Sequence, residues 1–140
     1  MEINNKKAYF NYYVEKEIES GIVLTGTEIK SIRKGSVNIK DAYIRIKNNE
    51  AFIINMYVAK YDAGEYFNHD EYRERKLLLH KKEIIKLKED ISISGYTLVP
   101  LKVYLNKNKV KVLIGICKGK KLYDKRKSLK EKELIKESRK

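Results

Sequence analysis

The sequence has little of what secreted and membrane proteins need. Its 140 residues include a single cysteine, Cys117, so no disulfide can form within the chain, and a reducing, cytoplasmic compartment is expected. No apolar run approaches the roughly 18 residues of a membrane-spanning helix. The first ten residues lack the apolar stretch of a secretory signal. These absences argue against a membrane protein and against a secreted disulfide-rich domain.

Motifs for catalysis and metal binding are also scarce. The two histidines, His69 and His80, and the single cysteine lack the number and spacing of zinc ligands. His69 does stand beside Asp70 and Glu71 in a polar stretch, which leaves a weak metal or acid–base alternative. The chain contains neither a G-x-x-x-x-G-K-[ST] phosphate loop nor a G-x-S-x-G elbow. We therefore expect no enzyme activity, no cofactor and no metal, and we interpret Cys117 as a small buried strand residue.

One sign of charge dominates the sequence. Lysine and arginine total 32 and acidic residues 19, which gives a net charge of +13. Residues 118–140 carry 11 basic and 4 acidic side chains, net +7, against 21 and 15, net +6, in residues 1–117. A basic tail favours a polyanionic partner, because each cation placed at a phosphate releases counterions. A general lysine bias is the alternative; a membrane surface fits poorly, because the tail has few large apolar residues.

Alternating apolar residues predict short strands over most of the body. Residues 12–18 alternate with period two, Ser20-Gly21 suggests a bend, and residues 22–24 are expected to resume as a strand. The apolar run at 77–79 is a further short strand, after a long polar loop over 60–74. The pattern is typical of a predominantly β protein.

Two hairpins are predicted. Residues 42–47 and 51–58 form the first, with Asn48-Asn49 in the left-handed turn conformation. Residues 97–105 and 109–117 form the second, joined by a loop over 106–108. In the second hairpin, four alternating apolar residues are expected to share one face: Val99, Leu101, Val103 and Leu105.

Helical spacing occurs in two places within the body. Residues 27–34 have apolar positions three apart and stop at Gly35, which predicts a short helix with a glycine cap. Residues 81–91 predict a second helix. Six or seven short strands with two helices favour a closed or nearly closed antiparallel barrel.

The tail follows a different pattern. Ser128 and Glu131 have the spacing of a capping box. The segment lacks a continuous apolar stripe, and isolated helices below about 12–15 residues are marginal in water. We therefore expect a barrel domain over 1–117 and a basic tail over 118–140 that is disordered when free and helical only on the ribosome or another partner.

Two segments stand out from the composition. Residues 118–126, KGKKLYDKR, place a glycine among cations directly after the last predicted strand, although a solvated linker is an equal alternative. Residues 73–80, RERKLLLH, place three basic residues against an apolar run, although a core strand with a charged start is the simpler interpretation.

These two segments, together with GIVLTGTEIKSIR at 21–33 and GYTLVPLK at 95–102, resemble the SsrA-binding protein (small protein B, SmpB) family. The resemblance runs in order from about Asn5 to Arg126. It implies an OB-fold-like antiparallel β-barrel with two or three flanking helices. It also implies a cytoplasmic, monomeric, non-enzymatic protein that does not act at membranes.

The family's role, as the resemblance implies it, is in trans-translation. The expected partners are the tRNA-like domain of transfer-messenger RNA (tmRNA), elongation factor Tu, and the stalled 70S ribosome with its 16S rRNA decoding centre. The tail is expected to occupy the empty message channel, so that the nascent chain is tagged and the ribosome released.

The resemblance also implies site residues. Six positions match those that contact tmRNA or shape its site: Asn5, Tyr12, Glu19, Leu78, Lys111 and Lys118. Lys111 suits a phosphate, Tyr12 a stacked RNA group and Leu78 an unstacked base, whereas Glu19 can accept from a base or ribose or orient a cation. Asn5 has an amide to offer to a sugar or base edge. Seven tail positions match the decoding-centre segment: Gly119, Lys120, Lys121, Tyr123, Asp124, Lys125 and Arg126.

The chain departs from the family pattern in three places. Phe10-Asn11 stands where a histidine and an acid are usual, so a polar RNA contact is not expected there. Lys118 replaces an arginine, which keeps charge but loses bidentate geometry. The tail ends somewhat early, so either Leu134 and Ile135 supply its last apolar contacts or the role of those contacts is reduced. Two other functions remain as alternatives to the role in trans-translation: a general OB-fold RNA-binding protein and an RNA-processing enzyme.

Overall fold

The computed structural model describes residues 1–61 and 68–120, except for the side chains at 93 and 94. The described chain holds three helices, namely α1 (Lys6–Asn11), α2 (Gly26–Arg33) and α3 (Lys81–Ser94). It also holds nine strands: β1 (Glu2–Asn4), β2 (Tyr12–Ile22), β3 (Val37–Asn38), β4 (Tyr43–Lys47), β5 (Glu50–Ile54), β6 (Tyr57–Val58), β7 (Arg75–Leu78), β8 (Thr97–Asn106) and β9 (Lys109–Gly119).

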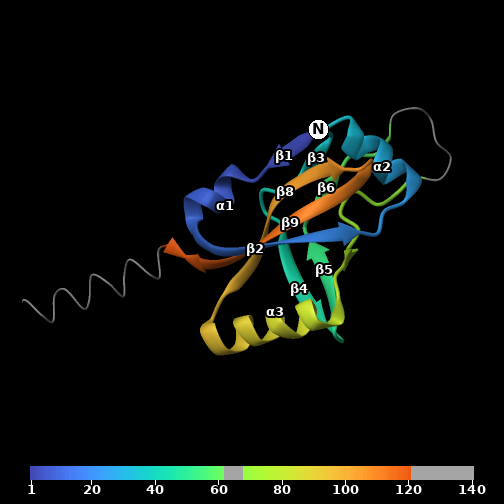
Figure 1. Cartoon of the computed structure of the whole chain (residues 1–140). Coiled ribbons are helices and arrows are strands. Elements are labelled where there is room, and N and C mark those ends of the chain that lie inside the picture. Colours follow the sequence, from blue (N-terminus) through green and yellow to red (C-terminus); the bar gives the residue numbers. More distant parts are fainter. Residues whose placement is uncertain (62–67, 121–140) are drawn as a thin grey trace, which may run out of the picture.

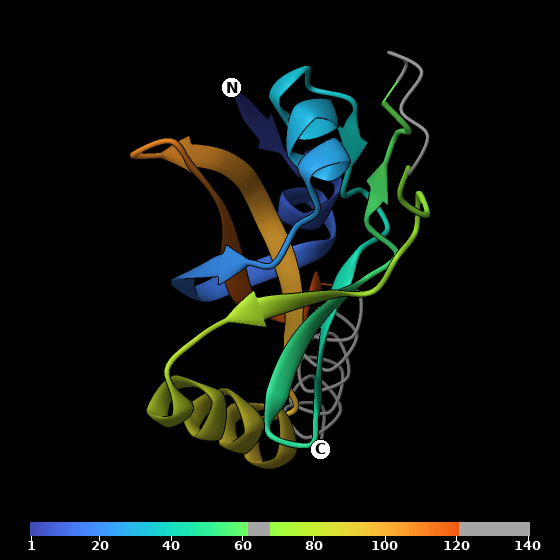
Figure 2. The ribbon, with the colours of Figure 1, turned by 90° about the vertical axis from the view of Figure 1, so that its right-hand side faces the viewer.

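Seven strands form one antiparallel sheet in the order β1-β8-β9-β2-β7-β5-β4, and β3 pairs with β6 in a small second sheet. The large sheet curls, with α3 at one end and α2 at the other (Figures 1 and 2). The curl brings β4 against β8, but no ladder joins them among the described strands. The predicted mainly β, antiparallel fold is confirmed, and its barrel is nearly closed, with a seam between β4 and β8.

The core lies inside the curl. Ile32 of α2, Ile53, Leu77 and Ile114 are at most 1% exposed and pack in one cluster. A smaller cluster lies under α1 and contains Ala8, Val99, Leu101 and Cys117. Cys117 is 0% exposed and lies on β9, so the expectation of a buried strand residue is confirmed. This burial raises the pKa of the Cys117 thiol to about 11.

The face predicted for β8 is wrong in one respect. The register between β8 and β9 shifts between Pro100 and Lys102. A bulge of this kind adds one residue to a strand and reverses which side chains point inward. Val99 and Leu101 therefore pack in the small cluster under α1, whereas Val103 packs in the main core.

Local signals set the helix ends, and the glycine predicted to follow the helix over 27–34 is confirmed. Thr25 and Glu28 form a capping box at the start of α2, and Gly35 follows its end with φ of 79°. Helix α3 extends three residues beyond the predicted range of 81–91, and Gly95, in the left-handed conformation, caps its end. Among the described residues, no helix is long and apolar enough to cross a membrane.

The bend predicted at Ser20-Gly21 is absent, because β2 continues through both residues. Ser20 donates its hydroxyl to Val112 O at 3.0 Å, and Gly21 pairs with strands on both sides of β2. A strand held by ladders on both edges does not turn where its sequence alone permits it.

The predicted turn of the first hairpin is confirmed, since Asn48 and Asn49 have φ of 52° and 60°. Its second strand ends early, at Ile54, because Asn55 is also left-handed and sends the chain into β6. The other hairpin closes with a two-residue turn at Lys107-Asn108 rather than the three-residue loop expected.

Strand β9 runs to Gly119, two residues past the predicted end of the last strand. The predictions for the tail beyond residue 120 lie outside the described residues, as does part of the long loop.

Candidate nucleic-acid interface

A row of side chains crosses the outer face of the sheet. Tyr104 on β8 pairs with Lys111 on β9, Lys111 pairs with Gly21 on β2, and Gly21 pairs with Leu78 on β7. Leu78 is 53% exposed, whereas its neighbour Leu77 is buried in the core. The row thus presents a hydroxyl, a cation and an apolar side chain side by side on the surface.

Gly21 determines how closely Leu78 approaches β2. A Cβ placed on Gly21 would lie 3.2 Å from Leu78 Cβ and 3.4 Å from its Cδ1. The 3.2 Å distance is tighter than an ordinary van der Waals contact, so a residue with a Cβ at position 21 would require Leu78 to shift by a few tenths of an ångström. The glycine therefore shapes the surface beneath Leu78 rather than making a turn.

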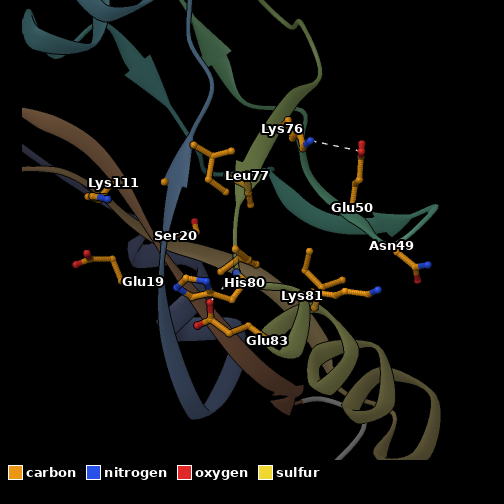
Figure 3. Close-up of a pocket in the computed structure, with 14 residues that line it drawn as sticks. Glu19, Ser20, Asn49, Glu50, Lys76, Leu77, His80, Lys81, Glu83 and Lys111 are labelled. Atoms are coloured by element: carbon orange, nitrogen blue, oxygen red, sulfur yellow. Dashed lines mark hydrogen bonds and ion pairs between the residues drawn. The ribbon is translucent and has the colours of Figure 1, made fainter.

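A hollow of about 640 Å³, the outer hollow, lies along this row. It brings together three of the six predicted RNA-binding residues, Glu19, Leu78 and Lys111. In Figure 3, Glu19 and Lys111 lie on one side and Asn49, Glu50 and Lys76 on the other, with the start of α3 at one end of the hollow.

Glu19 is engaged by a residue that the sequence analysis missed. The hydroxyl of Tyr104 donates to Glu19 Oε2, and burial together with this carboxylate raises the pKa of Tyr104 to about 12. Lys111 lies one strand away and pairs with no carboxylate in the described part of the chain. Tyr104 belongs to the same outward set as Lys102 and could have been found from that alternation.

Asn5 and Tyr12 lie apart from the outer hollow. They line a second cavity of about 440 Å³, the seam hollow, at the place where α1 and β8 meet the start of β4. Asn5 is 3% exposed and donates its amide to Ile39 O at 3.1 Å and Pro100 O at 2.9 Å. Its Oδ1 accepts from Ala8 N, which caps α1. The amide is fully used inside the protein, which favours the site-shaping one of the two roles predicted for Asn5.

Tyr12 directly follows α1, and its half-buried side chain packs against the small core cluster. The neighbouring Phe10 is 80% exposed, the largest value among the exposed large apolar side chains. An apolar ring therefore stands in solvent at the position where the family pattern has a histidine.

The base of the tail is held by aromatic and acidic side chains. Lys118 Nζ lies 3.7 Å from Glu15 Oε1 and 5.0 Å from the centroid of the Tyr96 ring. Tyr96 donates to Glu15 Oε2 at 2.8 Å, and this hydrogen bond raises the pKa of the Tyr96 hydroxyl. Lys120 Nζ lies 5.1 Å from the ring of Tyr13.

Of the seven tail positions predicted, Gly119 and Lys120 are described and the other five, Lys121, Tyr123, Asp124, Lys125 and Arg126, lie outside the described residues. No heavy atom lies within 4 Å of a Cβ built on Gly119, so space alone does not require glycine there.

Most of the basic segment at 73–76 has a structural role. Arg75 is fully buried, donates to Met56 O at 2.8 Å and donates its Nε to Glu28. Arg73 Nη2 reaches the other oxygen of Glu28 at 2.6 Å. Burial opposes ionisation of Glu28, but hydrogen bonds from Arg73, the Thr25 backbone and Arg75 outweigh it and lower the pKa of Glu28 to about 2. Two of the three predicted cations thus serve this ion cluster, which joins α2 to β7.

His69 is likewise a structural residue. Its ring is 6% exposed, Nε2 donates to Val58 O at 2.9 Å, and Nδ1 lies 2.9 Å from the Thr27 hydroxyl. Both ring nitrogens therefore have partners within the protein. No group of three or more potential metal ligands occurs in the part of the chain that the structure covers.

Comparisons with known proteins identify relatives of this chain. The family model described as SmpB protein matches residues 2–140. SsrA-binding proteins of Staphylococcus aureus, strains Newman and COL, are each 57% identical over 128 residues, which cover 91% of this chain and 83% of theirs. A solved structure described as "tmRNA-SmpB: a journey to the center of the bacterial ribosome" is similar with a TM-score of 0.71 and 42% identity, and the match covers 85% of this chain and 84% of that one.

Proposed function

The chain belongs to the SmpB protein family, and we propose that it binds the tRNA-like domain of tmRNA and delivers it to stalled ribosomes in trans-translation. The observation that carries this proposal is the outer hollow. Glu19, Leu78 and Lys111 are far apart in the sequence, and three adjacent strands bring them to one exposed surface. A surface that offers an unpaired cation, an acceptor and an exposed apolar side chain matches a folded RNA with unstacked bases.

In this proposal each side chain has a distinct task. Lys111 contacts a phosphate, since its ammonium has no carboxylate partner in the described chain. Leu78 packs on an unstacked base. Glu19 and Tyr104 act as one hydrogen-bonded unit, which presents the remaining carboxylate oxygen to a ribose hydroxyl or a base amino group.

The residues of the seam hollow act differently. Asn5 is a positioning residue that ties α1 to the Pro100 and Ile39 carbonyls. Tyr12 presents the exposed part of its ring to RNA along the same surface. Lys118 adds charge at the edge of the barrel, where Glu15 and Tyr96 hold it.

The tail supplies the ribosomal half of the function. Residues 119–126 enter the decoding centre beside 16S rRNA, with Tyr123 stacking on a ribosomal base and Asp124 fixing the start of the segment. The rest of the tail occupies the empty message channel. The protein works as a cytoplasmic monomer, and elongation factor Tu accompanies the complex to the 70S ribosome.

The protein acts by binding and is not an enzyme in this proposal. A general OB-fold RNA-binding protein is the second candidate, because the curled antiparallel sheet and basic surface suit many RNAs. RNA recovered with the protein from native cells separates the two. A single tmRNA species supports the proposal, whereas mixed ribosomal or transfer RNA supports the general binder.

The decisive experiment measures tmRNA affinity for the full chain and for a chain ended after Lys120, across a salt titration. Ending after Lys120 rather than after 117 keeps β9 whole, because this strand runs to Gly119. The shortened chain is expected to keep most of the tmRNA affinity and to lose tagging on stalled ribosomes. Equal losses in both assays would contradict the separation of barrel and tail.

A further inference from the structure

A third cavity, the tyrosine hollow, has no role in the function proposed above. It measures about 470 Å³ and is lined by Asn38, Asp41, Asn55, Tyr57 and Tyr72. All five are polar or aromatic side chains that can donate or accept hydrogen bonds. The rings can stack on a planar ligand, and the amides and the carboxylate can form hydrogen bonds with its edge.

Three of these residues come from three separate segments of the chain. Asn38 on β3 stands directly opposite Tyr57 on β6. Tyr72 lies in a turn where its N–H donates to Asp70 Oδ1 at 2.9 Å, and its ring centroid is 5.3 Å from that of Tyr57 at an interplanar angle of 53°. Tyr72 is nevertheless 61% exposed, so one tilted contact leaves most of its ring open to solvent.

The two amide side chains around the tyrosine hollow have N–H groups that can donate hydrogen bonds to a ligand. Asn38 Oδ1 accepts from Lys40 N at 2.8 Å, which leaves its amide nitrogen to donate to a ligand. No hydrogen bond within the described chain engages the side chain of Asn55, which stands at a left-handed position with φ of 60°. Asp41 is ionised, because a hydrogen bond from Lys7 lowers the pKa of its carboxyl.

The tyrosine hollow adjoins the seam hollow of the proposed RNA surface. Asp41 lines both this hollow and the seam hollow that holds Asn5 and Tyr12. At the border between them, Lys7 Nζ lies 2.7 Å from Asp41 Oδ1, and both side chains are about half exposed, at 47% and 67%. Lys40, which is exposed, also lines the seam hollow. An RNA strand whose phosphates meet these two lysines passes directly beside the tyrosine hollow.

We propose that the tyrosine hollow binds one unstacked nucleobase that carries an exocyclic amino group. The base stacks on the ring of Tyr72, the amides of Asn38 and Asn55 contact its edge, and Asp41 accepts from its amino group. This inference rests on the proposed function for the identity of the RNA, but the site itself is defined by its own side chains.

The direct test is a titration of the full chain with 5′-AMP, followed by NMR. Signals of Tyr72 and Asn55 are expected to shift in a saturable way with 5′-AMP and far less with 5′-UMP, which lacks an exocyclic amino group. Ribose 5-phosphate is the control for charge alone. Shifts of the same size with ribose 5-phosphate, or no shift at Tyr72 and Asn55, would overturn the proposal.

The test with RNA uses substitutions that leave the fold intact. Tyr72→Ala is expected to weaken binding of the tRNA-like domain about tenfold, since stacking of one base typically contributes between roughly fivefold and 150-fold, and Tyr72→Phe is expected to keep most of the affinity. Asn55→Gly removes the amide while suiting the left-handed backbone, with an expected loss of about threefold. Tyr61→Ala is the matched control, because this half-exposed tyrosine lies beside Lys30 and Lys34 and outside the hollow.

The outcomes separate this inference from the function on which it rests. Wild-type binding of the tRNA-like domain that neither Tyr72→Ala nor Asn55→Gly weakens overturns the nucleobase site and leaves the function standing. Failure of the wild type to bind that RNA overturns the function, and the 5′-AMP titration then still decides whether the hollow binds a base.

Discussion

The buried ion cluster of Glu28, Arg73 and Arg75 and the outer hollow are both rich in charge, but they use it in opposite ways. In the cluster, two guanidinium groups meet one carboxylate, and Glu28 and Arg75 are closed to solvent. In the outer hollow, Lys111 has no carboxylate partner among the described residues, and Leu78 stands exposed. The comparison teaches that the number of charges alone does not distinguish a structural cluster from a surface that can meet a partner, whereas the pairing and the solvent exposure of each charge do.

The largest effect is expected from breaking the buried cluster. Glu28→Ala leaves two guanidinium groups without their acceptor, and the loss of a buried partner typically costs about 3–5 kcal/mol of the free energy of unfolding. Urea denaturation measures this cost. Lys7→Ala, which breaks an exposed pair with Asp41, is the matched control and should cost less than about 1 kcal/mol. Equal costs for the two variants would show that the cluster is not a structural element.

The same cluster predicts how stability depends on pH. The pKa of Glu28 is about 2 in the folded protein, against an ordinary value of 4.5. Above the ordinary value the carboxylate is charged in both states and its stabilisation is complete. Below it, the unfolded chain takes up a proton that the folded chain refuses, so the free energy of unfolding falls until the pH reaches about 2.

Urea denaturation of wild type and Glu28→Gln over this pH range checks the prediction. The variant lacks the titrating group and is expected to lose less stability on acidification than the wild type. Parallel curves for the two proteins would mean that Glu28 does not titrate as its contacts require.

Changes in the outer hollow should leave stability nearly unaltered and reduce RNA affinity. Leu78→Ala is expected to weaken binding of the tRNA-like domain about fivefold, because the exposed side chain contributes contact with a base rather than with the core. Leu77→Ala is the contrasting control, since that buried neighbour should cost about 2–5 kcal/mol of stability. RNA affinity that stays at the wild-type level in Leu78→Ala would remove this leucine from the interface.

Lys111→Ala tests the electrostatic part of the same surface. The variant should bind tmRNA more weakly, and the slope of log K against log salt should become shallower by about one, because one phosphate contact is lost. Lys86→Ala, on an exposed turn of α3 away from the hollow, serves as the control for net charge. An unchanged slope in Lys111→Ala would exclude this lysine from the phosphate contacts.

The smallest effect is expected at the base of the tail. Tyr96→Phe removes the hydrogen bond to Glu15 but keeps the ring beside Lys118. Stability should change by less than about 0.5 kcal/mol, because the bond is exposed to solvent. Tagging on stalled ribosomes should change slightly while tmRNA affinity stays the same. A large fall in tmRNA affinity would show that Lys118 needs the Tyr96–Glu15 hydrogen bond, and not only the Tyr96 ring, to be held at the RNA surface.

Local chemistry made much of the fold predictable. Helix α2, which stops before Gly35, and the turn at Asn48-Asn49 depend on residues adjacent in the chain. The bulge after Pro100 could not be predicted in this way, because it is a mismatch between two strands and appears in neither strand alone. For the same reason the bend suggested by Ser20-Gly21 was wrong, since ladders on both sides of β2 hold it extended.

The candidate site divides in the same manner. The family resemblance pointed to Glu19, Leu78 and Lys111, but their grouping in one hollow, apart from Asn5 and Tyr12, required the register of β2, β7 and β9. The tyrosine hollow depends on Asn38, Tyr57 and Tyr72, none of which stood out in the sequence.

The sequence by itself determined a basic, mainly β chain with helices α2 and α3 and the turn at Asn48-Asn49, because period, caps and charge are carried by neighbouring residues, whereas the short helix α1 was not predicted. Its motifs pointed to the SmpB family. The tertiary structure decided which charged side chains are buried in ion pairs and which face solvent. Arg75 and Lys76 are adjacent in the chain, yet one is fully buried against Glu28 and the other is exposed. The physical reason is that a strand sends successive side chains to opposite faces, and only the curl of the sheet makes one face the interior.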